Sequence, residues 1–364
     1  MDRQFNTSIQ DNYGDQLILD NHSNPTKIAI MSDGKLVEFL SVLPPNIPQI
    51  GSVHIARIQQ VFKQHRLANA LLEDGTHISV RMSDEKLQTG SLALVTITAE
   101  PWDTKPARAV LGAELAGRYV IVLPGKPEIR RVSKNSGLNK DSTSQQVDLT
   151  AAGLPDEFGI ILRRQAADAQ ASSILNEIKN LITSWQDGAD LSFKLDHIST
   201  PKKIYSGPTL FHSAGIIAPL ANSKICIDDS EWQEIYDELD NAAKHRFITD
   251  QDVAIWFQPT KGLTAIDIDS AGSRLSLPQL MPHIGQTVLK QIRLRQISGA
   301  IFVDMPRLSK SDRIKFNQLC INYALADIRH PDIYGYGPAG LLEMTVRHRH
   351  MMLENRMKLL SSKA

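Results

Sequence analysis

The sequence predicts a chain of several domains that combines α/β and α+β architecture with a small all-β barrel. Residues 51–112 alternate apolar and polar side chains with a period of two, and turn residues separate the short runs. Beyond residue 252, short apolar strands alternate with helical patterns, as in a sheet that is covered by helices. The length of 364 residues also favours two or three domains over one.

The overall composition is that of an ordinary globular protein. Lys and Arg number 40, Asp and Glu also number 40, and 42% of the residues are apolar, which excludes disordered, collagen-like and disulfide-scaffold chains. Cys226 and Cys320 lie far apart and indicate neither a disulfide framework nor a Cys-rich zinc site. No apolar run reaches the roughly 18 residues that cross a bilayer, and no apolar signal segment follows Met1, so we expect a cytoplasmic protein without membrane contact.

The N-terminal region contains a predicted arm, a hairpin and a domain boundary. Residues 1–26 are polar and rich in Asn, Asp and Gln, so they are predicted to form a flexible arm. Two apolar runs follow at 27–31 and 36–40, and the Asp33–Gly34 step between them is a strong signal for a tight β-hairpin. Three prolines within residues 44–48 cannot continue a central strand and therefore mark a boundary.

The alternating region is predicted to form an OB-type barrel over residues 49–112. Several short strands in a segment of about 60 residues fit the size of that fold, and Asp74–Gly75 supplies one of the turns. Phe62 is either a stacking platform for a nucleic-acid base or a core residue. Strands of the barrel are expected at residues 53–58, 68–72, 77–81 and 92–97.

The rest of the chain mixes strands and helices. The apolar spacing from Ile174 to Trp185 predicts an amphipathic helix, and residues 230–245 are predicted to form an acidic helix. Further helices are expected at 286–296 and 311–327. Strands are expected at 119–123, 159–164, 253–257, 263–267 and 300–303.

Three aspartates follow or end two of these predicted strands. Asp267 and Asp269 project from the same side of one strand, because side chains alternate faces, and Asp304 ends the next strand. If the helix between them brings the strands together, three carboxylates gather at one edge of the sheet, where Mg²⁺ or Mn²⁺ would offset their repulsion. The simpler alternative is that the acids are solvated at strand ends or cap the following helix.

The charge is unevenly distributed although its total is zero. Residues 289–315 hold seven Lys and Arg against two acids, and residues 126–140 hold five against one. Residues 344–364 are also basic, whereas residues 223–252 hold nine acids against three bases. Any one basic run can be a solvated face, but runs that flank a carboxylate cluster favour a phosphodiester site.

Five segments, in order and with matching spacing, resemble the bacterial ribonuclease E/G family. The most specific is 263–271, LTAIDIDSA, which is similar to the family segment LTAIDINSA. The others are 117–124 (GRYVIVLP), 159–163 (GIILR), 291–304 (QIRLRQISGAIFVD) and 340–345 (GLLEMT). The resemblance extends over about residues 27–350.

The resemblance implies a domain layout that agrees with the predicted elements. It implies an RNase H-like domain that is interrupted by an OB-type RNA-binding barrel and a 5′-sensor, and that is followed by a DNase I-like catalytic domain. On this sequence the expected order is a flexible arm (1–26), a first RNase H-like segment (27–48), the barrel (49–112), the 5′-sensor (113–203), a second RNase H-like segment (204–245), the catalytic domain (246–350) and a basic tail (351–364).

The resemblance also implies an activity. A member of this family would be a metal-dependent endoribonuclease, a hydrolase of phosphodiester bonds that cleaves single-stranded RNA in RNA processing or decay. The implied cofactor is Mg²⁺, with Mn²⁺ as a substitute, and it would activate a water for attack on the phosphodiester. Asp267 and Asp304 match the two metal-binding aspartates of the family, and Asp269 stands where the family has an orienting Asn.

Four arginines are further candidates for RNA contact. By the same resemblance, Arg163 matches the arginine that binds the RNA 5′-monophosphate, and Arg164 stands where the family commonly has Thr. Arg293 and Arg295 lie within the basic run and either contact RNA phosphates or turn to solvent.

Several departures from the family pattern leave alternatives open. The barrel is shorter than in the family, and Asp269 replaces an amide donor with a carboxylate. The CPxC motif of larger members is missing, so we expect neither zinc nor a zinc-linked tetramer, whereas a homodimer is compatible with the sequence. The alternative function is that of a non-catalytic, regulatory RNA-binding paralogue. A small-molecule phosphoesterase would explain the acids but not the barrel.

Overall fold

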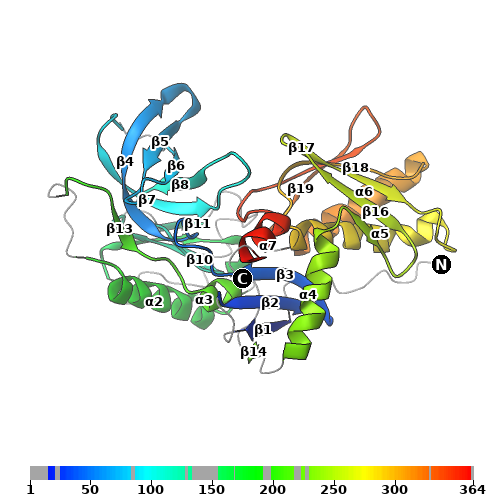
Figure 1. Cartoon of the computed structure of the whole chain (residues 1–364), viewed down its shortest axis with the longest axis horizontal. Coiled ribbons are helices and arrows are strands. Elements are labelled where there is room, and N and C mark those ends of the chain that lie inside the picture. The colour runs from blue at the N-terminus through cyan, green and yellow to red at the C-terminus, as the bar shows by residue number, and fades with distance from the viewer. Residues whose placement is uncertain are drawn as a thin grey trace. The chain divides into compact units, whose positions relative to one another are not determined.

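A computed structural model of the chain describes residues 15–20, 25–82, 87–127, 130–132, 155–167, 169–191, 198–216, 223–225, 229–327 and 329–361. The chain divides into two compact units (Figure 1). One unit is Leu43–Ile216, and the other combines Met1–Val42 with Ile217–Ala364. The second unit is thus assembled from the two ends of the sequence.

The Leu43–Ile216 unit begins with a closed five-stranded barrel. Its strands are β4 (Val53–Phe62), β5 (Leu67–Leu71), β6 (His77–Arg81), β7 (Leu92–Ala99) and β8 (Ala107–Leu111). They pair in the order β4-β5-β6-β8-β7, and β7 returns to pair with β4. Alternate residues, such as Ala68 and Ala70, point into the core, which explains the period of two. The barrel predicted from the sequence is therefore confirmed, and its closure fits an OB-type domain.

A second sheet and a long helix complete this unit. The sheet has the order β11-β12-β10-β9, from Arg130–Val132, Phe158–Leu162, Val120–Pro124 and Leu115–Ala116. The helix α2 (Ala171–Gly188) buries Ile174, Ile178 and Trp185 against it, as its apolar spacing predicts. The remaining elements are η1 (Lys63–His65), η2 (Arg164–Ala166), β13 (Lys202–Tyr205), which pairs with β4, and α3 (Leu210–Gly215).

The other unit contains a four-stranded sheet with the order β14-β1-β2-β3. The strands β2 (Lys27–Ser32) and β3 (Lys35–Ser41) form the predicted hairpin, in which Asp33 and Gly34 both have positive φ, as a tight two-residue turn requires. The prediction of a flexible arm over residues 1–26 is wrong for Gln16–Asp20. These residues form β1, which pairs with β2 and with β14 (Ser223–Ile225). Leu17 and Ile18 of this strand are buried there.

Two helices pack beside this sheet. The helix α4 (Asp229–Ala243) is the predicted acidic helix, and α7 (Leu353–Ser361) contacts it. The predicted basic tail, residues 351–364, includes α7, which buries Leu353 and Arg356, and Arg356 donates to the carbonyl oxygen and hydroxyl of Ser41. A charge count does not distinguish this packed helix from a solvated tail.

A six-stranded sheet with the order β15-β16-β17-β18-β20-β19 forms the rest of the unit. Its strands are Arg246–Ile248, Ala254–Pro259, Leu263–Asp269, Gly299–Asp304, Leu342–Val346 and Asp332–Tyr336, in that spatial order. The helices α5 (Leu277–Leu294) and α6 (Lys310–Ala326) share one core with it. The α5 helix begins earlier than the predicted 286–296, because the backbone of Ser276 at its N-terminus donates to the Gln279 side chain.

The two faces of this six-stranded sheet differ. Along β17, Ile266 and Ile268 are buried in the core with the helices, whereas Asp267 and Asp269 are exposed on the opposite face. The sheet therefore presents one open face that carries polar and charged side chains. Within the described ranges, no helix is long and apolar enough to cross a membrane.

Candidate active site

The strand register brings Asp267 and Asp304 together. The strands β17 and β18 are parallel, since α5 forms the crossover between them, and Asp267 lies directly opposite Asp304. Neighbouring strands are about 4.8 Å apart, and register partners in parallel strands share a face. Both aspartates are exposed, while Ile266 and Val303, which precede them, are buried. The open face therefore holds two adjacent carboxylates on two rigid strands.

Asp269 lies on the same face, but its carboxylate binds the backbone of the turn that follows β17. It is two residues beyond Asp267, which is about 6.6 Å along an extended strand. Its Oδ1 accepts a hydrogen bond of 2.9 Å from the backbone nitrogen of Ala271, so the carboxylate stabilises the turn that ends β17. Within the residues that the structure describes, no three His, Cys, Asp or Glu side chains are grouped to hold a metal ion. The described residues thus show Asp267 and Asp304 opposite each other, and a place for Asp269 in a shared metal site stays a prediction.

Arg293 does not reach the open face. It is 2% exposed, and its Nε donates to Oε2 of Glu38 at 3.0 Å. Glu38 is also buried and accepts from Arg329 and Gln296, at 2.9 and 3.2 Å. Burial by itself would raise the pKa of Glu38, but the Arg329 and Arg293 guanidinium groups outweigh burial and hold the pKa well below its usual range.

Arg295 is also buried, at the C-terminus of α5. Its guanidinium carbon lies 4.2 Å from the centroid of the Phe257 ring, and its Nε donates to Oε1 of Gln291 at 2.9 Å. Burial lowers the pKa of Arg295 to about 10. The predicted phosphate contacts of Arg293 and Arg295, and the alternative that they turn to solvent, are therefore both wrong.

Arg163 and Arg164 belong to the other unit and follow β12. The backbone nitrogen of Arg163 donates to the carbonyl oxygen of Tyr119 at 2.7 Å, and its guanidinium donates to the carbonyl oxygen of Gly117. Both arginines are half-buried at the start of η2. Of the basic run at 126–140, residues 128–129 and 133–140 lie outside the described ranges. A role in binding the RNA 5′-phosphate stays a prediction.

The α2 helix fixes the segment that Arg163 contacts. Both carboxylate oxygens of Glu177 accept hydrogen bonds from backbone nitrogens, of Arg118 at 2.6 Å, Tyr119 at 2.7 Å and Val120 at 3.0 Å. A side chain on Gly117 would collide with this carboxylate. The glycine at the start of the GRYVIVLP segment therefore serves close packing.

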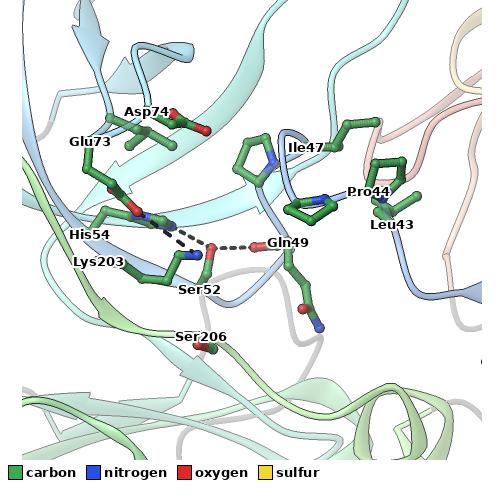
Figure 2. A pocket seen from close by; sticks show the side chains of 13 residues that line it. Leu43, Pro44, Ile47, Gln49, Ser52, His54, Glu73, Asp74, Lys203 and Ser206 are labelled. Carbon is green, nitrogen blue, oxygen red and sulfur yellow. Dashed lines mark hydrogen bonds and ion pairs between the residues drawn. The ribbon is translucent and has the colours of Figure 1, made fainter. Parts of the chain in front are cut away.

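A pocket of about 210 Å³ lies within the Leu43–Ile216 unit, beside the start of β4 (Figure 2). The proline-rich segment 43–49 forms one wall. The ring of His54, which is buried, lies between two polar partners, with Nδ1 3.1 Å from Glu73 Oε2 and Nε2 2.9 Å from Ser52 Oγ. The hydroxyl of Ser52 donates to the carbonyl oxygen of Gln49 at 2.6 Å. The sequence pattern does not reveal these linked side chains, because His54 occupies an ordinary position in an alternating strand.

We expect His54 to titrate below its usual pKa of 6.5. Burial disfavours the imidazolium and lowers the pKa, and this effect outweighs the opposing hydrogen bond and charge of Glu73. Between the two pKa values the unfolded chain binds the proton and the folded chain does not, so stability rises with pH through the window just below 6.5. NMR titration of the His54 ring measures the midpoint directly, with His54→Gln to assign the signal. A midpoint at or above 6.5 would contradict the expected effect of burial.

The open face of the six-stranded sheet also carries residues that the sequence pattern did not single out. Trp256 on β16 lies directly opposite Asp267, and Arg246 on β15 lies directly opposite Trp256. The guanidinium carbon of Arg246 is 5.5 Å from the centroid of the Trp256 ring. The period-two alternation of AIWFQP, which places Trp256 between buried Ile255 and Phe257, is the signal that could have indicated its exposure.

Comparison with known proteins gives one family. The model of the "Ribonuclease E/G family" matches residues 114–246 and 227–350. Ribonuclease G of Salmonella typhimurium is 21% identical over 322 residues, which cover 78% of this chain and 65% of that protein. Ribonuclease E of Buchnera aphidicola subsp. Acyrthosiphon pisum is 24% identical over 316 residues, which cover 71% of this chain and 33% of that protein. The chain thus spans less than two thirds of these relatives.

Proposed function

The chain belongs to the ribonuclease E/G family, and from that membership we propose that it is an endoribonuclease that hydrolyses single-stranded RNA with Mg²⁺ as cofactor. The observation that carries this proposal is the register of β17 and β18, which sets Asp267 opposite Asp304 on an exposed sheet face. Hydrolysis would leave a 5′-phosphate on the downstream product. The six-stranded sheet with α5 and α6 would be the DNase I-like catalytic domain, and the β14-β1-β2-β3 sheet would belong to the RNase H-like domain.

The chemistry of the donor pair fits Mg²⁺, with Mn²⁺ as a substitute. Sites for Mg²⁺ commonly use one or two carboxylates and complete the octahedron with waters and substrate phosphate oxygens. When bound, such an ion supplies charge neutralisation at the phosphate and lowers the pKa of a coordinated water. Asp267 and Asp304 would hold it from neighbouring strands, whose hydrogen-bonded backbones keep the carboxylates in place. Their exposure leaves the RNA backbone free to approach.

The other proposed site residues have roles of their own. Asp269 would position the turn after β17 through its bond to the Ala271 backbone nitrogen, and thereby orient the carboxylate of Asp267. Arg163 and Arg164 would bind the 5′-monophosphate, because guanidinium groups match phosphate oxygens and both side chains are only half-buried.

Incubation of the purified chain with 5′-monophosphorylated single-stranded RNA tests the proposal. We expect endonucleolytic products that require Mg²⁺ or Mn²⁺, and slower cleavage of the same RNA with a 5′-hydroxyl. Double-stranded RNA of the same sequence serves as the control substrate. Absence of cleavage at enzyme concentrations well above the RNA-binding Kd would contradict the proposal.

A non-catalytic RNA-binding paralogue is the second candidate. It is favoured by Asp269, which is a carboxylate where the family has an amide and which is occupied with the Ala271 turn. This candidate predicts tight binding of single-stranded RNA without metal-dependent cleavage. The incubation experiment therefore separates the two functions.

A further inference from the structure

Four exposed side chains form one row across the six-stranded sheet. Successive register pairs connect Arg246 with Trp256, Trp256 with Asp267, and Asp267 with Asp304, over the neighbouring strands β15, β16, β17 and β18. All four lie on the open face, away from α5 and α6. The row runs from a cation through an aromatic ring to the two carboxylates.

Trp256 is the unusual member of this row. Its two neighbours in β16, Ile255 and Phe257, are buried in the core, while the Trp256 side chain remains 38% exposed on the open face. Arg246 approaches the indole from the β15 side, with its guanidinium carbon 5.5 Å from the ring centroid. The opposite neighbour of Trp256 is Asp267, so the indole stands between the cation and the carboxylate pair.

The spacing of the row matches a nucleotide chain. Trp256 is one strand from Asp267 and two strands from Asp304, or about 5 and 10 Å by the usual strand separation. A phosphodiester held at the carboxylate pair would therefore have a neighbouring base within reach of the indole. An indole stacks on the face of any base, and a guanidinium at the far end suits the next phosphate.

We propose that Trp256 stacks on the base of a nucleotide that flanks the scissile phosphate, and that Arg246 contacts an adjoining phosphate. This inference rests on the proposed endoribonuclease function and deepens it. Trp256 is then a positioning residue that holds single-stranded RNA over Asp267 and Asp304. A duplex would be disfavoured, because its bases are already stacked on one another.

Binding and fluorescence test this role without requiring cleavage. Trp256→Ala should weaken binding of a 5′-monophosphorylated oligonucleotide about tenfold, and Trp256→Phe, which keeps a stacking ring, should weaken it less than about threefold. The wild-type chain has four tryptophans. RNA should quench part of their fluorescence, and that part should disappear in Trp256→Phe although the RNA still binds.

Tyr334→Ala is the matched control. Tyr334 is 66% exposed on β19 of the same sheet, and its hydroxyl bonds to Oγ1 of Thr345 at 2.9 Å. It lies two strands beyond β18, on the side away from Trp256, so its removal should change RNA affinity less than about twofold. Circular dichroism of each variant establishes that it is folded.

The outcomes separate this inference from the proposed function. Unchanged affinity in Trp256→Ala, or quenching that persists in Trp256→Phe, would overturn the stacking role even if the wild type cleaves RNA. If the wild type does not cleave RNA but the Trp256 variants change RNA affinity as expected, the proposed endonuclease activity is overturned. The stacking of Trp256 on a bound base then still holds. A change in sedimentation of Trp256→Ala without RNA would assign this face to self-association and would overturn the proposal.

Discussion

Asp304→Asn is expected to lower the rate of RNA cleavage at least about a hundredfold at saturating RNA and Mg²⁺. The carboxamide keeps the size of the side chain but removes the charge and one of the two adjacent carboxylates that the β17–β18 register provides. The affinity of the site for the cation should fall, and less positive charge would then be available to neutralise the scissile phosphate. Single-turnover cleavage of 5′-monophosphorylated RNA, measured across a Mg²⁺ titration, reports the rate and the metal dependence together.

Asp332→Asn provides the matched control for this measurement. Asp332 is an exposed aspartate on β19 of the same sheet, and its register partner is Thr345 rather than another acid. Its replacement should leave cleavage within about twofold of the wild type. Because Asp304 is exposed, Asp304→Asn should also unfold within about 0.5 kcal/mol of the wild type. Equal cleavage by the wild type and Asp304→Asn would remove Asp304 from the site.

Glu38→Gln is expected to reduce the free energy of unfolding by about 3–5 kcal/mol. Glu38 is 2% exposed and bonds to Arg293, which is equally buried, and to Arg329. The amide removes the negative charge that these guanidinium groups bind in a buried site, which is the costly way to break an ion pair. Urea unfolding, followed by circular dichroism, gives the midpoint and the free energy.

Glu354→Gln is the exposed counterpart. Glu354 pairs with Lys358 one turn along α7, and both side chains are substantially solvated, so loss of the pair should cost less than about 0.5 kcal/mol.

Glu38 should also make the stability of the protein sensitive to acid. Its pKa is lowered in the folded state, so its contribution is complete above pH 4.5 and declines as the pH falls further. A Glu38→Gln variant with wild-type stability at pH 7 would show that the buried network is not stabilising.

The features that the sequence predicted correctly have local signals. The Asp33–Gly34 turn, the alternation in the barrel strands and the apolar stripe of α2 each arise from residues a few positions apart. The neighbourhood of Asp267 and Asp304 could also be anticipated, because a strand, helix, strand sequence favours a parallel pair.

The features that the sequence did not predict depend on distant partners. The Nε of Arg293 is held by Glu38, a residue 255 positions earlier, so nothing in the basic run 289–315 distinguishes this arginine from a phosphate ligand. The strand β1 acquires its burial from β2 and from β14, which is about two hundred residues away. The hydrogen bond from the Ala271 backbone to Asp269 is also not predictable from the strand, because alternation places the side chain on a face but does not fix which group its carboxylate binds.

The insertion of Leu43–Ile216 between β3 and β14 imposes an order on synthesis at the ribosome. The hairpin of β2 and β3 emerges first, yet Arg293, Arg329 and Arg356, which bond to its Glu38 and Ser41, follow 255, 291 and 315 residues later. At about 5–20 residues per second, that delay is on the order of ten to sixty seconds. The continuous Leu43–Ile216 unit is fully synthesised within that delay. It can therefore fold first, while Glu38 in the nascent hairpin still lacks the arginines that neutralise its charge.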